Sequence, residues 1–126
     1  MNLHEYTAAA ERTCPQLGYP RTSEPTRASP IDNAHMVLGM VTEVAELADV
    51  FKKDMAYGKP VDWINVGEEV ADVMWYLVNF CRMNNITLER ELDKNINKLR
   101  VRFPDKFSGK AAINRNVAAE RVELEK

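Results

Sequence analysis

Two long segments with the apolar spacing of α-helices, residues 33–54 and 62–83, constrain the fold of this chain more than any other feature. In both segments apolar side chains recur every three to four residues, which places them along one face of a helix. Only a short run with the turn-forming sequence Tyr57-Gly58-Lys59-Pro60 separates them. Because so short a connection brings the chain back on itself, we predict a long central hairpin of two helices.

The remaining segments predict shorter helices. Residues 2–13 favour a helix that ends before Pro15, and residues 87–103 favour one that begins at Thr87 and stops at Pro104. We expect Asp32 or Asn33 to cap the first long helix and Asp62 to cap the second. Residues 14–31, with four prolines among them, predict a loop, and residues 108–126 a polar C-terminal helix.

Strand patterns are absent from the sequence, since no segment alternates apolar and polar residues between hairpin turns. We therefore predict an all-α fold, a helical bundle of four to five helices. The length of 126 residues suits a single domain, 1–126, with its core at 33–107.

The net charge and the cysteines indicate which partners the protein can bind and in which compartment it works. A formal net charge of −2 gives no electrostatic basis for binding nucleic acid or a membrane surface. Cys14 and Cys81 have neither the spacing of zinc ligands nor that of a disulfide framework, which favours a reducing compartment. The sequence shows no signal peptide and no apolar run long enough to span a membrane, so we expect a cytoplasmic protein.

Four carboxylates lie beside the apolar stripes of the two long helices, where charged groups are unexpected. Glu43 falls on the line of Met36 and Leu47, and Glu46 borders the same stripe; Glu69 aligns with Val73, and Asp72 lies next to it. A single Glu-x-x-Glu pair usually marks a solvated face. Two such pairs on facing helices are costly unless a cation neutralises them, and oxygen ligands favour Mg²⁺ or Mn²⁺ over zinc.

A di-iron bundle is the competing metal site, and the sequence argues against it. Such a site needs Glu-x-x-His pairs. Neither His4 nor His35 follows a glutamate by three residues.

The two carboxylate motifs resemble those of the MazG-like nucleotide pyrophosphohydrolases, whose signature is EExxE, a spacer and ExxD. The matching runs are Thr42-Glu43-Val44-Ala45-Glu46-Leu47 and Glu68-Glu69-Val70-Ala71-Asp72-Val73-Met74-Trp75. The resemblance covers about residues 33–107 and includes Lys52-Lys53, Tyr57-Gly58-Lys59 and Asp62. Thr42 stands where the family has its first glutamate, so the number of bound metal ions stays open. The run Ala112-Ile113-Asn114-Arg115 is similar to phage and mobile-element members, which would place the protein in a host cytoplasm.

The resemblance implies an enzyme that hydrolyses a (deoxy)nucleoside triphosphate between its α and β phosphates, for control or clearance of the nucleotide pool. It implies that Mg²⁺ is bound by four residues that also form the catalytic group, with Glu46 as the candidate for orienting the attacking water. These are Glu43, Glu46, Glu69 and Asp72. The expected substrate-binding residues are His35, Lys53, Asn95, Lys98 and Arg102.

The family also implies a homodimer or homotetramer. The apolar arc of helix 33–54 is wider than one neighbouring helix requires, which favours the same conclusion. Two alternatives stay open at this point. One is a phosphoribosyl-ATP pyrophosphohydrolase, which shares the fold and signature. The other is a non-catalytic helical interaction module, in which the carboxylates form salt bridges across an interface.

Overall fold

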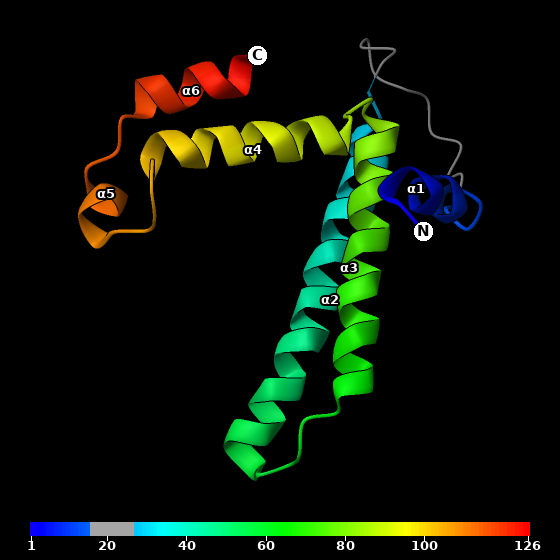
Figure 1. Ribbon diagram of the computed structural model, residues 1–126. Coiled ribbons are helices and arrows are strands. Elements are labelled where there is room, and N and C mark those ends of the chain that lie inside the picture. Colours follow the sequence, from blue (N-terminus) through cyan, green and yellow to red (C-terminus); the bar gives the residue numbers. More distant parts are fainter. Residues whose placement is uncertain (16–26) are drawn as a thin grey trace. The chain divides into compact units, whose positions relative to one another are not determined.

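The computed structural model describes residues 1–15 and 27–126, and in these residues it contains six α-helices and no β-strand (Figure 1). The helices are α1 (Leu3–Glu11), α2 (Pro30–Tyr57), α3 (Trp63–Met83), α4 (Leu88–Arg102), α5 (Gly109–Ile113) and α6 (Val117–Glu125). The predicted all-α fold is confirmed. Among the helices of these residues, none is long and apolar enough to cross a membrane.

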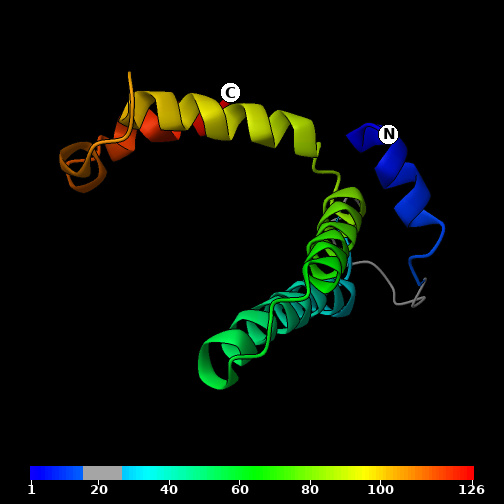
Figure 2. The same ribbon diagram turned by 60° about the horizontal axis from the view of Figure 1, so that its bottom comes forward.

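The chain divides into two compact units, Met1–Ile86 and Thr87–Lys126. The first unit holds α1 to α3 and the second holds α4 to α6. In the first unit, α2 and α3 run side by side over most of their length, as both Figure 1 and Figure 2 show. The predicted central hairpin is therefore present, and it carries all four carboxylates singled out from the sequence.

Both ends of the long α2 depart from the predicted boundaries. The helix begins at Pro30 because Ser29 is its N-cap, and the Ser29 hydroxyl accepts a hydrogen bond from the Asp32 N–H at 3.1 Å. The prediction that Asp32 or Asn33 caps this helix is wrong, because proline is well suited to the first helical position. The helix ends at Tyr57, where Gly58 adopts a left-handed φ of 63°.

The start of α3 agrees with the predicted cap, and asparagines form the turn after the helix. Asp62 caps α3 by accepting hydrogen bonds from the N–H groups of Ile64 and Asn65. Asn85 has a φ of 52°, as expected for an asparagine in a turn. Asn84, only 5% exposed, donates to the Asn33 side chain at 2.7 Å and thereby joins the end of α3 to the start of α2.

Helix α1 packs against α3, and polar contacts join the two. The Trp75 indole N–H donates to the Thr13 hydroxyl at 2.8 Å, and Arg82 forms an ion pair with Glu11 at 3.0 Å. Trp75 is thus a packing residue between α3 and the segment that follows α1. The predicted loop 14–31 falls largely outside the described residues, and its last two residues, 30 and 31, are helical.

The segment 108–126 of the second unit differs from the single C-terminal helix predicted there. This segment contains two helices, α5 and α6, separated at Asn114-Arg115-Asn116. Asn116 caps α6 by accepting a hydrogen bond from the Ala119 N–H at 3.1 Å, and asparagine favours such breaks. Helix α6 packs along α4, so it is an integral part of this unit. Thr87 occupies the N-cap of α4, but its side chain makes no capping hydrogen bond.

Candidate metal centre

Three carboxylates from the two helices of the hairpin converge on one point. Glu43 of α2 and Glu69 and Asp72 of α3 each offer an oxygen, and these oxygens all lie within 4.8 Å of one another. Glu69 and Asp72 share one side of α3 because they are three residues apart. Glu69 is buried, Glu43 is partly exposed and Asp72 is exposed, so the cluster is open to solvent on one side.

The charges of this cluster oppose one another. Burial, then the negative charges of Glu46, Asp72 and Glu69, and a side-chain hydrogen bond with Glu69, raise the pKa of Glu43. Among the described residues, no ion pair joins any of these four carboxylates to a lysine, arginine or histidine. A set of oxygen donors without a cationic side chain fits a hard divalent cation.

Glu46 lies beside this cluster rather than within it. It is exposed, and it lines a pocket of about 290 Å³ together with Glu69 and Lys53. The ordinary helix geometry explains the difference, since Glu46 is one turn further along α2 than Glu43 and so faces an earlier turn of α3. The structure therefore brings together three of the four predicted ligands and places Glu46 next to them.

Two polar residues of this pocket were not identified from the sequence. Asn65 donates a hydrogen bond from its amide to Glu69 Oε1 and fixes one side of that carboxylate. Asp49 forms ion pairs with both Lys52 and Lys53, and these hydrogen-bonded lysines lower the pKa of Asp49 to about 2. Helical spacing could have indicated that both residues lie near the carboxylates. Asn65 precedes Glu69 by one turn, and Asp49 follows Glu46 by three residues.

His35 lies two turns before Glu43 on α2. Its ring contacts Tyr76 of α3 edge-on, with ring centroids 6.1 Å apart and an interplanar angle of 79°. Its Nδ1 is buried and has no hydrogen-bond partner among the described residues. A buried acceptor or donor without a partner is costly, so this atom is suited to binding a group from outside the chain.

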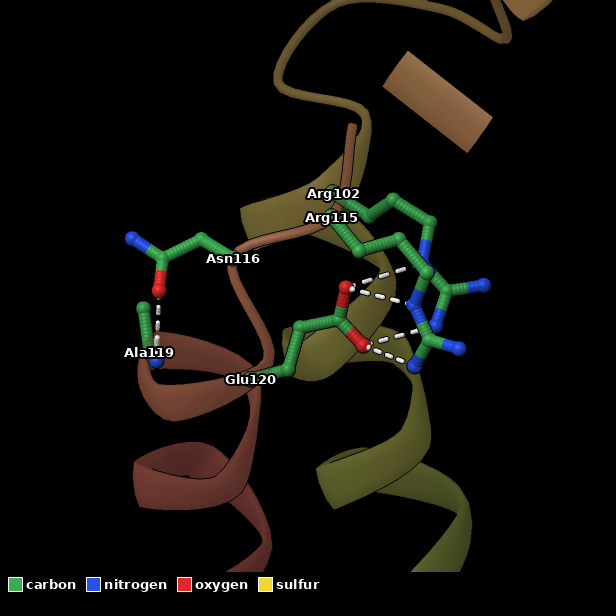
Figure 3. Close-up of polar contacts among 5 residues, drawn as sticks. All are labelled: Arg102, Arg115, Asn116, Ala119 and Glu120. Atoms are coloured by element: carbon green, nitrogen blue, oxygen red, sulfur yellow. Dashed lines mark hydrogen bonds and ion pairs between the residues drawn. The ribbon is translucent and has the colours of Figure 1, made fainter. Parts of the chain in front are cut away.

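The three residues predicted to bind substrate from the fourth helix, Asn95, Lys98 and Arg102, lie on α4 in the second unit. Arg102 is engaged within that unit. Figure 3 shows its guanidinium and that of Arg115 on the same carboxylate, Glu120, which is 2% exposed. Arg102 donates at 2.9 and 2.6 Å, and Arg115 at 3.3 and 2.6 Å. A contact between Arg102 and a phosphate through these same N–H groups would require this ion pair to open.

The segment that contains the helical hairpin and its carboxylates matches the model of a known family. The model of the MazG nucleotide pyrophosphohydrolase domain matches residues 32–107. The chain belongs to the MazG family. The MazG domain includes all the residues singled out above on α2, α3 and α4, whereas α1, α5 and α6 lie outside it. Comparison with curated proteins gives no match, and comparison with solved structures gives none either.

The MazG match and the geometry support the same coarse conclusion. Nucleotide pyrophosphohydrolases act on a polyphosphate, a highly anionic substrate that three clustered carboxylates would repel. A divalent cation removes this repulsion, because it binds carboxylates on one side and phosphate oxygens on the other. The cluster of Glu43, Glu69 and Asp72 in this MazG domain has the oxygen donors that could hold such a cation.

Proposed function

We propose that this protein is a Mg²⁺-dependent nucleoside triphosphate pyrophosphohydrolase. In the reaction, water attacks the α-phosphorus, the bond between that phosphorus and the bridging oxygen breaks, and a nucleoside monophosphate and pyrophosphate leave. The observation that carries the proposal is the convergence of Glu43, Glu69 and Asp72, whose oxygens lie within 4.8 Å of one another with no ion pair to a cationic side chain among the described residues. The MazG match over residues 32–107 supports the reaction class.

In this proposal Glu43, Glu69 and Asp72 hold Mg²⁺, with Mn²⁺ as an acceptable substitute. The bound ion supplies charge neutralisation at the phosphate oxygens and makes a water molecule more acidic. Asn65 keeps the Glu69 carboxylate in one orientation through its hydrogen bond. Such a restraint preserves the ligand geometry when the substrate enters.

Glu46 has a different place in the proposal, because it stands next to the three-residue cluster. A carboxylate close to the metal but outside its nearest ligands can orient a water molecule and accept its proton. We assign that role to Glu46. It can equally become a fourth ligand when a second ion binds, so the proposal leaves the number of ions open.

The phosphates and the nucleoside need further contacts. Lys53 shares the pocket of about 290 Å³ with Glu46 and Glu69, and it is our candidate for binding the leaving pyrophosphate. This requires Lys53 to release Asp49, which also has Lys52 as a partner. His35, whose buried Nδ1 has no hydrogen-bond partner in the part of the chain that the structure describes, is the candidate for a hydrogen bond to the nucleotide. We retain Asn95, Lys98 and Arg102 as substrate-binding residues from α4.

We also propose that the protein works as a homodimer or homotetramer. One face of α2 carries apolar residues at alternating spacings of four and three, the seam of a coiled coil. Its members are Val37, Val41, Val44, Ala48, Phe51 and Met55. The large side chains among them are 43–83% exposed in this chain. Exposed apolar surface of this extent on a single helix face favours a second copy as its partner.

The biological role that fits is control or clearance of (deoxy)nucleotides in a cytoplasm, the host's if the gene is carried by a phage. The two alternatives are a phosphoribosyl-ATP-type pyrophosphohydrolase and a helical interaction module without catalysis. Neither is favoured by a particular contact in the described residues, and both predict a different outcome in the experiment below.

The deciding experiment is a panel of the eight common nucleoside and deoxynucleoside triphosphates together with phosphoribosyl-ATP, each with Mg²⁺ and assayed separately for pyrophosphate and phosphate. We expect pyrophosphate and the matching monophosphate from at least one of them. Release of phosphate would show that another bond is cleaved. Activity confined to phosphoribosyl-ATP would support the first alternative. No hydrolysis, together with a melting temperature that Mg²⁺ does not raise, would support the interaction module.

A further inference from the structure

Helix α1 adds a structural element beside the metal centre that the MazG domain match does not include. The match begins at residue 32, whereas α1 spans Leu3–Glu11. Two contacts hold α1 against the C-terminal half of α3: that of Thr13 with Trp75 and that of Glu11 with Arg82. Ala10 of α1 is buried, with 4% of its surface exposed. The position of α1 is therefore fixed relative to the helix that carries Glu69 and Asp72.

Tyr6 brings α1 closest to the carboxylate cluster. Its hydroxyl donates a hydrogen bond to the backbone carbonyl of Ala71 at 3.2 Å, and Ala71 immediately precedes Asp72. Tyr6 and Ala71 both line one pocket at this point of the first unit. One aromatic ring from outside the MazG domain thus borders a proposed metal ligand.

A pocket of about 350 Å³ opens next to this ring. Its walls are mostly apolar, and its volume lies within the range of small-molecule sites. The residues that line it are Met1, Asn2, Leu3, Tyr6, Ala71 and Met74. The pocket thus has the flexible thioethers and the aromatic ring with which proteins bind flat, apolar groups.

We propose that this pocket binds the base of the nucleotide whose phosphates meet the cluster of Glu43, Glu69 and Asp72, with Tyr6 as a specificity-determining residue that stacks on the base. The inference rests on the proposed function. Apolar walls disfavour the phosphates and the hydroxylated sugar, so the heteroaromatic base is the part of the substrate that suits them. Ala71 in the pocket wall is followed directly by Asp72 of the cluster, so the pocket lies close enough to the cluster for one nucleotide to reach both.

The test compares Tyr6→Ala, Tyr6→Phe and Leu3→Ala with the unmodified chain. Each is assayed on nucleoside triphosphates and on ribose 5-triphosphate, which has no base. Loss of a ring that stacks on a base typically weakens binding by about tenfold or more. We expect Tyr6→Ala to lower kcat/KM by about that factor for nucleotides and to leave ribose 5-triphosphate unaffected. Tyr6→Phe keeps the ring and should stay near the parent value, and Leu3→Ala should show a smaller loss with the same selectivity.

A control and a direct binding measurement complete the test. His4→Ala changes an exposed residue of the same helix and should leave kcat/KM unchanged for both kinds of substrate. Added nucleoside monophosphate should shift the Tyr6 ring signals in an NMR spectrum, and hydrogen exchange of the α1 amides should show that α1 stays docked in the variants.

Two results would overturn the inference. One is an equal loss on nucleotides and ribose 5-triphosphate. The other is an unchanged kcat/KM for nucleotides in Tyr6→Ala while α1 remains docked. Both differ from failure of the proposed function, in which the unmodified chain would release no pyrophosphate from any nucleotide. In that case, absence of the NMR shift would overturn the inference independently.

Discussion

Gly39 of α2 lies directly against the ring of Tyr76 in α3. A Cβ atom at position 39 would come within 2.1 Å of the Tyr76 Cε1 and 2.4 Å of its Cδ1 and Cζ. Gly39 is one helical turn before Glu43, and Tyr76 is one turn after Asp72. This close approach therefore sets the separation of α2 and α3 next to the carboxylate cluster, and it links the packing of the hairpin to the geometry of the proposed metal site.

Gly39→Ala should destabilise the protein by about 1–3 kcal/mol, the usual cost of inserting atoms into a well-packed interface. Gly67 in the interior of α3 is the matched control, because a Cβ there meets nothing within 4 Å. Gly67→Ala should be neutral or stabilising by about 0.4–1 kcal/mol. Denaturant unfolding of both variants measures the difference. Equal stability of the Gly39→Ala protein and its parent would show that Tyr76 moves aside easily.

Removing one charge from the carboxylate cluster should lower the activity and leave the protein folded. Glu43→Gln and Asp72→Asn should each lower kcat/KM for triphosphate hydrolysis on the order of 100-fold or more. Each removes one negatively charged ligand, so the Mg²⁺ that neutralises the substrate phosphates is bound more weakly. Without metal, both variants should melt no earlier than the parent, since a repulsive charge is gone. Glu68→Gln, an exposed residue next to Glu69, is the control and should keep normal turnover. Near-normal turnover of either cluster variant would remove that residue from the ligand set.

The raised pKa of Glu43 predicts how stability changes with pH. A carboxyl with a raised folded-state pKa contributes stability below the ordinary glutamate value of about 4.3, and this contribution is lost as the pH rises through the folded-state pKa. In EDTA, melting temperature should therefore fall with rising pH above that value by more in the parent than in Glu43→Gln. Mg²⁺ should reverse the trend, because it binds the ionised cluster. Parallel curves for parent and variant in EDTA would contradict this.

Glu120 should stabilise the second unit. Its hydrogen bonds with Arg102, and then with Arg115, hold the pKa of this carboxyl well below its usual range. A lowered pKa contributes stability above the ordinary glutamate value of about 4.3, and that stability is lost as the pH falls. Glu120→Gln should therefore lower the melting temperature at neutral pH and speed hydrogen exchange in α6. Glu125→Gln, which breaks the exposed pair with Arg121, should change little. Similar exchange in both variants would refute the role of Glu120.

The apolar seam on α2 should govern assembly. Val44 is 50% exposed in this chain and lies in the middle of the seam. A charge there would be buried by a second copy, so Val44→Glu should shift the protein to monomer in light scattering after size exclusion. Ala56→Glu, on the same helix about 100° from the seam, is the control. A parent that is already monomeric at micromolar concentration would overturn the prediction.

The periodicity of apolar residues was sufficient to predict α2 and α3, because each of these helices is long and keeps one face in contact with its neighbour. Helix boundaries were harder to predict. Ser29 and Asp32 both have side chains that cap helices, and only the backbone around Pro30 decides between them. Residues 108–126 show no strong periodicity, so the break at Asn114-Arg115-Asn116 was missed.

By itself, the sequence determined the all-α class, the hairpin and the MazG resemblance, because helical spacing and short motifs are local properties of the chain. Tertiary structure decided which charges meet. It gathered Glu43, Glu69 and Asp72 and placed Glu46 beside them. It also paired Arg102 with Glu120 and brought Tyr6 next to Ala71 from 65 residues away. Such contacts depend on the angle and separation of packed helices, which side-chain volumes such as those at Gly39 and Tyr76 set.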